Sequence, residues 1–216
     1  MMVAVAEPEP IFLYGAGGHG RAVGEVIRRE GRFRVECLLD DTMTGSAGGI
    51  PIVGGREALA QVAERGITRG FVSIGNNADR ELVSTLAEAA GLELVTIVDP
   101  AAVVASDARL GGGTVLMPMS MAGASARIGR GAIVNTSATV DHDCVVEDYA
   151  HLSAGVHLSG GCQIGARSFV GIGSSIGGAV RIGSRAIIGA GAAVVGDIPD
   201  GVVAAGVPAR RISSSP

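Results

Sequence analysis

An aliphatic residue recurs at every sixth position from Val98 to Val194, without an insertion or a slip. A period of six fits neither the roughly 3.6-residue repeat of a helix nor the simple alternation of a long strand. It is typical of a hexapeptide parallel β-helix, in which each short strand supplies one inward aliphatic residue and the next residues turn a corner. The repeated positions are Val98, Val104, Leu110, Leu116, Ala122, Ile128, Val134, Val140, Val146, Leu152, Leu158, Ile164, Val170, Ile176, Ile182, Ile188 and Val194.

A second inward position lies two residues before each aliphatic one and is mostly small, with Val156 and Val180 as the larger exceptions. Three hexads make one triangular coil, so the run predicts almost six coils, each about 4.8 Å high, in a prism roughly 27 Å long. A Gly/Ala-rich linker, the alternative, would not keep inward and outward residues in register. The small residues are Ala102, Ala108, Thr114, Ser120, Ala126, Ala132, Ala138, Cys144, Ala150, Cys162, Ser168, Ser174, Ala186 and Ala192.

The composition agrees with this fold and narrows the class of partner. Aromatic residues make up 3% of the 216 residues, which is low for a globular core but suits a solenoid filled by Val, Ile, Leu and Ala. The net charge of -4 gives no reason to expect nucleic acid or an anionic membrane as partner. The start, MMVAVAEPEP, lacks the basic region of a signal peptide, and no apolar run approaches the roughly 18 residues of a membrane span. We therefore expect a cytoplasmic protein.

The three cysteines are expected to be reduced thiols, because the chain shows no secretory signal. Cys144 and Cys162 are one coil apart and should stack, which is compatible with a disulfide or a metal pair. Both occupy the small inward position that Ala fills in other hexads. Packing in the core is therefore the favoured interpretation.

The residues before the solenoid alternate between strand and helix patterns. We expect strands over 11–14, 35–39, 70–74 and 92–97, and helices over 21–30, 56–65 and 78–90. This order predicts a small parallel Rossmann-like α/β sheet with right-handed crossovers. Pro199 and Pro208 cannot donate inside a strand, so the C-terminal residues should cap the last coil. The expected parts are a mobile N-terminus over 1–10, the Rossmann-like domain over 11–97, the β-helix over 98–199, and a tail or cap over 200–216.

A glycine motif follows the first expected strand. Gly15, Gly17 and Gly20 fit G-x-G-x-x-G, and Asp40 lies 20 residues beyond Gly20, so the dinucleotide fingerprint is formally complete. Fewer than 100 residues, however, hold only half of a dinucleotide fold, and the solenoid offers no second half. We therefore expect a nucleotide-bearing ligand, held by backbone N–H groups and a helix N-terminus, at the carboxyl ends of the strands. The alternative is that the glycines serve only a tight turn.

Three of the four histidines lie between His142 and His157. Counted from Val140, His142 falls in a corner and should project outward. Its carboxylate neighbours, Asp141 and Asp143, could fix its tautomer and raise its basicity, which suits a general base.

Gly160 lies one coil beyond His142, so its N–H could face an oxyanion formed beside the base. A zinc site is the rival use of the histidines. Because His151 and His157 should lie on different faces, they could share a metal only across a subunit boundary.

Together these segments resemble one family, the sialic-acid-O-acetyltransferase-like branch of the hexapeptide acyltransferases. The resemblance covers nearly the whole chain, and its motifs are Tyr14-Gly-Ala-Gly-Gly-His19-Gly, Leu39-Asp40-Asp41, Ile74-Gly75-Asn76-Asn77, Asn135-Thr-Ser, His142-Asp-Cys, His151-Leu-Ser and Gly206-Val-Pro-Ala-Arg210. Members of this branch N-acetylate the 4-amino group of nucleotide-linked 4-amino-4,6-dideoxy sugars. The resemblance implies a left-handed β-helix, a homotrimer with active sites between prisms, acetyl-CoA as acyl donor and nucleotide-sugar binding by the N-terminal domain. From the positions of the histidines we expect no metal.

The resemblance also implies roles for individual residues. His142 would be the general base, next to Asp143, where the family often has Glu, and Gly160 would offer its N–H to the acyl oxygen. Acetyl-CoA would be held near its thioester by His151 and Gly160, and along the pantetheine arm by Ile172, Gly173 and Ala190. The nucleotide sugar would be held by Gly17, often Ser in relatives, and by Gly18, His19, Asp40, Asp41 and Gly75.

The resemblance thus implies a sugar N-acetyltransferase of glycan or lipopolysaccharide biosynthesis, with GDP-perosamine or a UDP-4-amino-4,6-dideoxy sugar as substrate. A sugar O-acetyltransferase of the same fold is the near alternative. An NAD-dependent oxidoreductase, a zinc-dependent solenoid resembling carbonic anhydrase and a purely structural solenoid are the alternatives from other classes.

Overall fold

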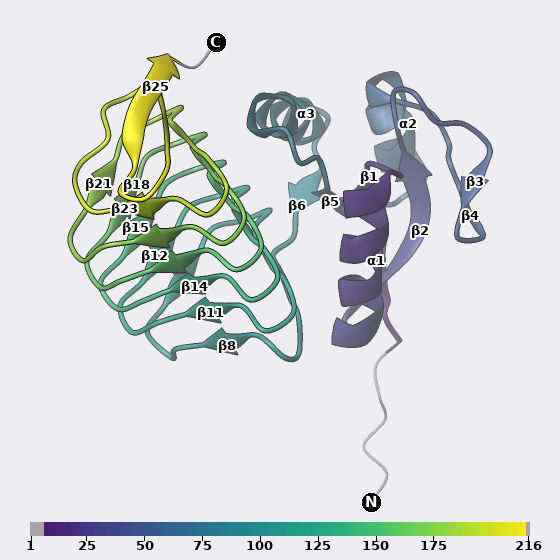
Figure 1. The fold of residues 1–216 in the computed structure, drawn as a ribbon. Coiled ribbons are helices and arrows are strands. Elements are labelled where there is room, and N and C mark those ends of the chain that lie inside the picture. The colour runs from purple at the N-terminus through teal and green to yellow at the C-terminus, as the bar shows by residue number, and fades with distance from the viewer. Residues whose placement is uncertain (1–6, 215–216) are drawn as a thin grey trace, which may run out of the picture.

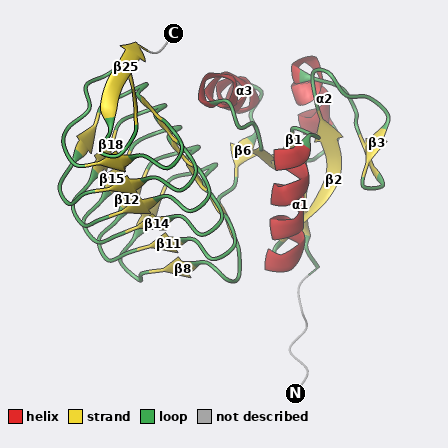
Figure 2. Ribbon diagram, viewed as in Figure 1, coloured by secondary structure: helices red, strands yellow, loops and turns green. Residues whose placement is uncertain are grey.

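The computed structural model describes residues 7–214, which form an α/β unit followed by a triangular solenoid (Figure 1). The α/β unit holds a parallel sheet of four strands in the order β2-β1-β5-β6. Within the described residues all helices belong to this unit, while the solenoid consists of short strands and turns (Figure 2). The strands are β1 (Glu9–Tyr14), β2 (Phe33–Leu39), β5 (Arg69–Val72) and β6 (Glu93–Leu94), and the helices are α1 (Gly18–Glu30), α2 (Leu59–Glu64), entered through a 3-10 turn (Arg56–Ala58), and α3 (Asn77–Ala89).

The helices form where the sequence pattern predicts them, with differences at their ends. Helix α1 begins at Gly18, three residues before the expected start, because its first turn is built from the glycine motif, which carries no apolar periodicity. It ends at Gly31, whose φ of 78° is the left-handed conformation that glycine adopts most readily. Helix α3 is capped by Asn76, whose side chain accepts hydrogen bonds from the N–H groups of Ala78 and Asp79.

One expectation for the α/β unit is wrong, and one element was not predicted. The expected strand over 92–97 is two strands: β6 joins the α/β sheet, and β7 (Ile97–Val98) already belongs to the solenoid. The sequence LELVTI over residues 92–97 fits a single strand and does not show where one sheet ends and another begins. A hairpin, β3 (Ser46–Ala47) and β4 (Ile50–Pro51), was also not predicted, although both residues of its Gly48-Gly49 loop have the positive φ of a two-residue hairpin turn.

The solenoid has three faces of parallel two-residue strands, and equivalent strands are 18 residues apart. Face 1 holds β7, β10 (Val115–Leu116), β13 (Ile133–Val134), β16 (His151–Leu152), β19 (Phe169–Val170) and β22 (Ile187–Ile188). Face 2 holds β8 (Val103–Val104), β11 (Met121–Ala122), β14 (Thr139–Val140), β17 (His157–Leu158), β20 (Ser175–Ile176) and β23 (Ala193–Val194). Face 3 holds β9 (Arg109–Leu110), β12 (Arg127–Ile128), β15 (Val145–Val146), β18 (Gln163–Ile164) and β21 (Arg181–Ile182).

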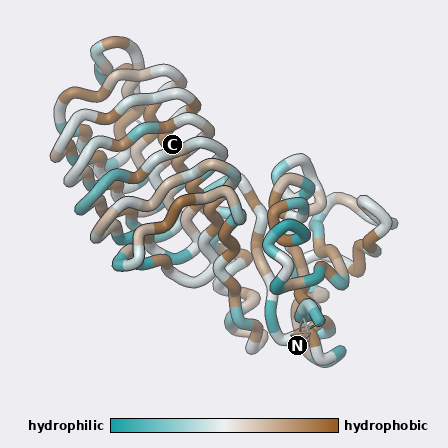
Figure 3. The backbone as a smooth tube through the Cα atoms, turned by 90° about the horizontal axis from the view of Figure 1, so that it is seen from below, coloured by the Kyte–Doolittle hydropathy of each residue, from teal (hydrophilic) through white to brown (hydrophobic). Residues whose placement is uncertain are grey.

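The interior of the prism is the predicted one. From Leu116 onward the sixth-position residues are buried, and Cys144 and Cys162 are buried free thiols. The first coil is the exception, because no coil stacks below it: Val104 is 38% exposed, and Leu110 is half-buried. Seen from below, apolar residues alternate with polar ones along the stacked coils (Figure 3). The predicted α/β domain followed by a parallel β-helix is confirmed.

From Gly113 to Gly191, each corner of the prism contains one residue with a left-handed backbone conformation. Several of these residues are not glycine, which is uncommon because a Cβ is crowded there. The corner geometry therefore recurs regardless of residue type. The non-glycine examples are Met119, Ser125, Ser137, Asp143, Tyr149, Arg167, Ala179 and Arg185, all with φ between 54° and 59°.

The C-terminal residues cover one end of the prism. Strand β24 (Val202–Ala205) continues face 1 beside β22, and β25 (Arg210–Ser214) pairs antiparallel with β24. At the other terminus, residues 1–6 of the expected mobile segment lie outside the described residues, and Glu9 and Pro10 belong to β1. None of the helices in residues 7–214 is long and apolar enough to cross a membrane.

The α/β unit packs against face 1. Residues of that face, Ile97, Val115 and Ile133, share an apolar cluster with Val23 and Ile27 of α1. Helix α3 lies beside the corner between faces 3 and 1, where Arg130 pairs with Glu88 and Arg167 with Glu81. Face 1 is thus largely covered, which determines the surroundings of the site residues on it.

Candidate active site

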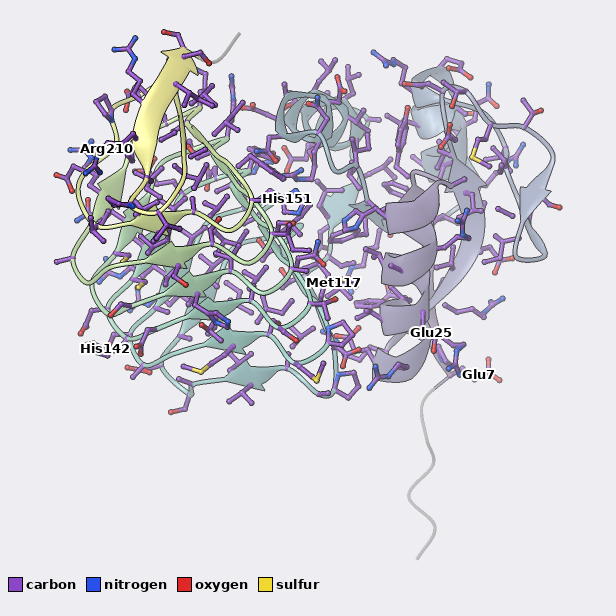
Figure 4. The ribbon with its side chains drawn as sticks, in the orientation of Figure 1. Glu7, Glu25, Met117, His142, His151 and Arg210 are labelled. Carbon is purple, nitrogen blue, oxygen red and sulfur yellow. The ribbon has the colours of Figure 1, made fainter. Side chains whose placement is uncertain are left out.

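His142 lies at the corner between β14 on face 2 and β15 on face 3, and its side chain is 62% exposed. Figure 4 shows it on the side of the solenoid that faces away from the α/β unit. Asp143 occupies the left-handed position of this corner, and its Oδ2 lies 2.8 Å from His142 Nδ1. The side chain of Asp141 accepts a hydrogen bond from the His142 backbone N–H at 2.7 Å.

This arrangement favours a basic Nε2 on His142. The hydrogen bond to Asp143, followed by the charge of Asp141, raises the pKa of His142 above its ordinary value. In the neutral ring, Nδ1–H is the donor to Asp143, so Nε2 carries the lone pair that a general base needs. The predicted role of His142 therefore has the tautomer that it requires.

Gly160, at the same corner one coil later, lies close against the His142 ring. A Cβ added to Gly160 would lie 2.5 Å from both Cε1 and Nε2 of His142. The neighbouring Gly161 N–H donates to the His142 carbonyl oxygen at 2.9 Å, which ties the two coils together at this corner. Glycine at position 160 is therefore required by the close approach of the imidazole.

His151 lies on face 1, where the α/β unit covers it. Although His151 precedes the inward-facing Leu152 in β16, it is only 7% exposed. Its ring meets Phe169 edge-on at 5.1 Å between centroids, and its Nδ1 lies 3.3 Å from the Gly75 carbonyl oxygen. Burial, followed by the charge of Arg80, lowers the pKa of His151 to about 4.

The residues predicted for acetyl-CoA lie at a different corner from His142. Ile172 and Gly173 form the corner between β19 on face 1 and β20 on face 2, and Ala190 occupies that corner one coil later. Ile172 is 57% exposed. His142 follows a strand of face 2, whereas these residues precede one, so face 2 separates the two groups within this chain.

The residues predicted for the nucleotide sugar gather at the carboxyl ends of β1, β2 and β5. Gly17 and Gly18 begin α1, Asp40 and Asp41 follow β2, and Gly75 follows β5. A cavity of about 240 Å³ opens between these ends, lined by Tyr14, Gly15, Asp40, Asp41, Arg56, Ile74, Asp79, Leu82 and Val83. A larger apolar cavity of about 510 Å³ lies between α1, β2 and the β3–β4 hairpin, and the predicted substrate residues do not line it.

Both aspartates already have partners in the protein. Asp40 accepts hydrogen bonds from the N–H groups of Ala16, Thr42 and Met43, which hold its pKa below the ordinary value although burial raises it. Through its hydrogen bond with the Ala16 N–H, Asp40 therefore holds the glycine-rich turn after β1 in place.

Asp41 pairs with Arg56, which lowers its pKa to about 2, and it also accepts a hydrogen bond from the Tyr14 hydroxyl at 2.5 Å. Burial and Asp41 together raise the pKa of Tyr14. An anionic carboxylate at the cavity wall suits hydroxyl or base N–H groups of a nucleotide.

The glycines of this region fall into two groups. A Cβ on Gly20 would lie 1.8 Å from the Gly15 carbonyl oxygen, so packing of α1 against the turn requires Gly20. A Cβ on Gly17 or Gly75 would meet nothing within 4 Å, and neither residue has a positive φ. Space at Gly17 and Gly75 is what a ligand that approaches the backbone needs.

His19, which is predicted to bind the nucleotide sugar, lies close to His151, which is predicted to bind acetyl-CoA. Its ring centroid lies 6.3 Å from that of His151, and burial, followed by the charge of Arg80, lowers its pKa. Its Nε2 is buried and lacks a hydrogen-bond partner among the described residues. A residue predicted for the nucleotide sugar therefore lies beside one predicted for acetyl-CoA.

Sequence reasoning missed Arg80, a buried side chain that contacts both parts of the chain. The one available signal was its place in the apolar face of α3, between Asn76 and Val83. Across the described residues, no three His, Cys, Asp or Glu side chains gather in a way that could hold a metal ion.

The chain is similar to known proteins in both sequence and structure. Residues 10–86 match the family described as PglD N-terminal domain. The acetyltransferase domain of PglB from Neisseria gonorrhoeae FA1090 is 37% identical to this chain. Its structure superposes with a TM-score of 0.91, over 94% of this chain and 100% of that chain. The same domain has also been solved in complex with acetyl coenzyme A. The chain belongs to the PglD-like hexapeptide-repeat acetyltransferases.

Members of this family are sugar N-acetyltransferases that use acetyl-CoA. PerB from Caulobacter crescentus, solved with CoA and GDP-perosamine, is 38% identical, with a TM-score of 0.92 over 98% of this chain and 100% of that chain. The same enzyme has been solved with one histidine replaced by asparagine or by alanine. UDP-N-acetylbacillosamine N-acetyltransferase from Bacillus subtilis (strain 168) is 38% identical over 109 residues, which are 48% of this chain and only 49% of that protein.

Proposed function

We propose that the chain transfers the acetyl group of acetyl-CoA to the 4-amino group of a nucleotide-linked 4-amino-4,6-dideoxy sugar. The observation that carries the proposal is the His142–Asp143 pair on an exposed corner, with Nε2 free to take a proton. Relatives that match almost the whole chain bind CoA with GDP-perosamine, or acetyl-CoA. UDP and GDP sugars are both candidates, because the relatives include enzymes named for each.

In the proposed mechanism, His142 Nε2 removes a proton from the amine as the amine nitrogen attacks the thioester carbonyl carbon. The oxyanion that forms accepts a hydrogen bond from the Gly160 N–H. Collapse of the intermediate breaks the carbon–sulfur bond, and the protonated imidazole returns its proton to the leaving thiolate. Asp143 stabilises the imidazolium between these two steps.

The geometry supports an active site between two copies of the chain. Within one prism, face 2 separates His142 from the corner of Ile172, Gly173 and Ala190. A rotationally symmetric trimer would place the His142 corner of one prism against the Ile172 corner of the next. Gly17, Gly18, His19, Asp40, Asp41 and Gly75 would then present the nucleotide sugar from the side of the α/β unit.

The test of the base is replacement of His142. We expect His142→Asn and His142→Ala to lower turnover by about 10²- to 10⁴-fold, with an unchanged assembly in light scattering. Full activity in either variant would disprove the role. Thermal shift with UDP- and GDP-4-amino sugars, with and without CoA, identifies the nucleotide, since a ligand at 100 times its Kd stabilises by about 2.7 kcal/mol.

Matched amino and hydroxy versions of the preferred sugar distinguish N- from O-acetylation. NAD serves as the control ligand and should not stabilise the protein.

Mixing two inactive variants tests the shared site. His142→Asn removes the base, and Ala190→Trp fills the predicted pantetheine groove on the opposite edge of face 2. In every mixed trimer one interface combines an intact His142 with an intact Ala190, so random subunit exchange should restore about a quarter of the wild-type activity. A site contained in one chain would give no restoration.

A further inference from the structure

Arg80 is a buried cation held between the two parts of the chain. It is 1% exposed, and its guanidinium donates to the carbonyl oxygens of Gly131 at 2.7 Å, Tyr149 at 2.7 Å and Ile74 at 2.9 Å. It also donates to the Gly75 carbonyl at 3.3 Å and to Asn77 Oδ1 at 2.8 Å. Among the described residues these partners are all neutral oxygens, so the charge of Arg80 is not cancelled by a carboxylate in direct contact.

The hydrogen-bond partners of Arg80 belong to both the α/β unit and the solenoid. Ile74 and Gly75 form the loop after β5, which borders the proposed nucleotide-sugar site. Gly131 and Tyr149 are equivalent corner residues of successive solenoid coils. Through these hydrogen bonds Arg80 links the loop of Ile74 and Gly75 to the solenoid.

The Gly75 carbonyl that Arg80 contacts also faces His151. His151 Nδ1 lies 3.3 Å from this oxygen, and an oxygen acceptor requires a hydrogen on Nδ1. On the other side of the ring, Nε2 lies 3.4 Å from Asn135 Nδ2. The Thr136 N–H donates to Asn135 Oδ1 at 2.8 Å, which orients the amide so that its NH₂ group faces Nε2. Both contacts assign the same neutral tautomer, with the lone pair on Nε2.

Two charged or titratable groups face His151 from the elements packed on it. Arg80 approaches from α3 and His19 from α1, and both disfavour a proton on His151, in addition to burial. The third neighbour, Phe169, is an uncharged ring on the next coil. Among residues 7–214, the groups that shift the pKa of His151 include no carboxylate.

We propose that Arg80 is a positioning residue for His151: it orients the Gly75 carbonyl to accept from Nδ1–H, which leaves Nε2 unprotonated, and an N–H group of the bound ligand replaces the distant Asn135 amide as the donor to Nε2. The N–H group belongs either to an amide of the CoA pantetheine arm or to the amine of the nucleotide sugar. The tautomer is independent of the proposed function, whereas the ligand contact rests on it.

The first test is the tautomer itself. Long-range ¹H–¹⁵N spectra of histidine-labelled protein should show His151 as the Nδ1–H tautomer between about pH 6 and pH 8. A hydrogen on Nε2 in this range would overturn the proposal without any variant or ligand.

The second test removes the charge of Arg80. In Arg80→Met the midpoint of the His151 titration should rise by about one pH unit, while that of His142 stays unchanged. Arg80→Lys keeps the charge but cannot reach all the carbonyls, so His151 should stay uncharged while losing its single tautomer. The matched control, Arg130→Met, removes the ion pair with Glu88 at the same interface and should leave His151 as it is.

An unchanged His151 in both Arg80 variants would overturn the positioning role. Should Arg80→Met fail to fold, the Arg80→Lys spectrum decides.

The third test concerns the ligand. Addition of CoA alone or of the nucleotide sugar alone should shift the His151 Nε2 resonance, and the active addition identifies the donor. If both ligands stabilise the protein in thermal melts but neither moves Nε2, the acceptor role is wrong although the proposed function stands. If neither ligand binds, it is the proposed function that fails, and the His151 spectra of the Arg80 variants still test the positioning role.

Discussion

The imidazole of His142 occupies the space into which a Cβ on Gly160, the residue at the same corner one coil later, would project. Gly160→Ala would place a methyl group 2.5 Å from the ring and displace it from Asp143. We expect turnover to fall by about 10- to 100-fold with little change in Tm, because the corner is exposed. Gly178→Ala, one coil further on, is the matched control: its Cβ would lie 3.6 Å from the Ser159 hydroxyl, an ordinary contact. Equal activity of the two variants would show that the ring position does not matter.

Asp143→Asn should move the acid limb of the pH profile of kcat/KM to lower pH. Asp143 raises the pKa of His142, and the base acts only when it is unprotonated, so loss of the carboxylate lets it lose its proton at lower pH. Turnover at the plateau should fall by about tenfold, because the imidazolium loses its partner. Asp141 raises the pKa of His142 less than Asp143 does, so Asp141→Asn should move the acid limb by a smaller amount. An acid limb at the same pH in Asp143→Asn would mean that another group controls it.

Gly75→Ala and Gly20→Ala should separate binding from folding. A methyl group at Gly75 meets nothing in the protein, so Tm should stay unchanged while the KM for the nucleotide sugar rises. Gly20→Ala would collide with the Gly15 carbonyl and should destabilise the α/β unit by at least about 2 kcal/mol. Chemical denaturation and initial-rate kinetics on both variants check this. An unaltered KM in Gly75→Ala would leave the open space at Gly75 without a role in binding.

The stability of the protein should fall on acidification between about pH 6.5 and pH 4, partly because of His151. Its pKa is lowered from 6.5 to about 4 in the folded state, so in this window the unfolded chain binds more protons than the folded one. Stability therefore rises with pH there, and the loss between pH 7 and pH 5 is about 2 kcal/mol. His151→Asn keeps a donor for the Gly75 carbonyl and should reduce this pH dependence. Identical slopes in urea titrations of the two proteins would contradict the burial of a neutral His151.

The solenoid could be predicted almost completely from the sequence, because one local rule repeats. Each hexad specifies its own inward residues, and the resulting faces depend on no distant segment. The rule fails at Val104, where the chain lacks a lower coil to cover the side chain. It also could not place the boundary between β6 and β7, because residues 92–98 fit one strand pattern although the two strands join different sheets.

The candidate site was predictable only where it depends on the repeat. The outward position of His142 and its proximity to Gly160 follow from counting residues, and the structure agrees with both. The burial of His151 could not be predicted, because it depends on how the α/β unit packs on face 1. The same holds for Arg80, whose partners lie up to 69 residues away in the chain.

Because each coil closes after eighteen residues, insertions and deletions in the solenoid fall into two kinds. A change of six residues would pass every later strand to the next face and carry Ile172 away from its edge of face 2. A change of eighteen would only lengthen or shorten the prism by about 4.8 Å and leave every later residue on its own face. The length of the prism can therefore change during evolution, whereas the angular position of each functional group about the prism axis stays the same.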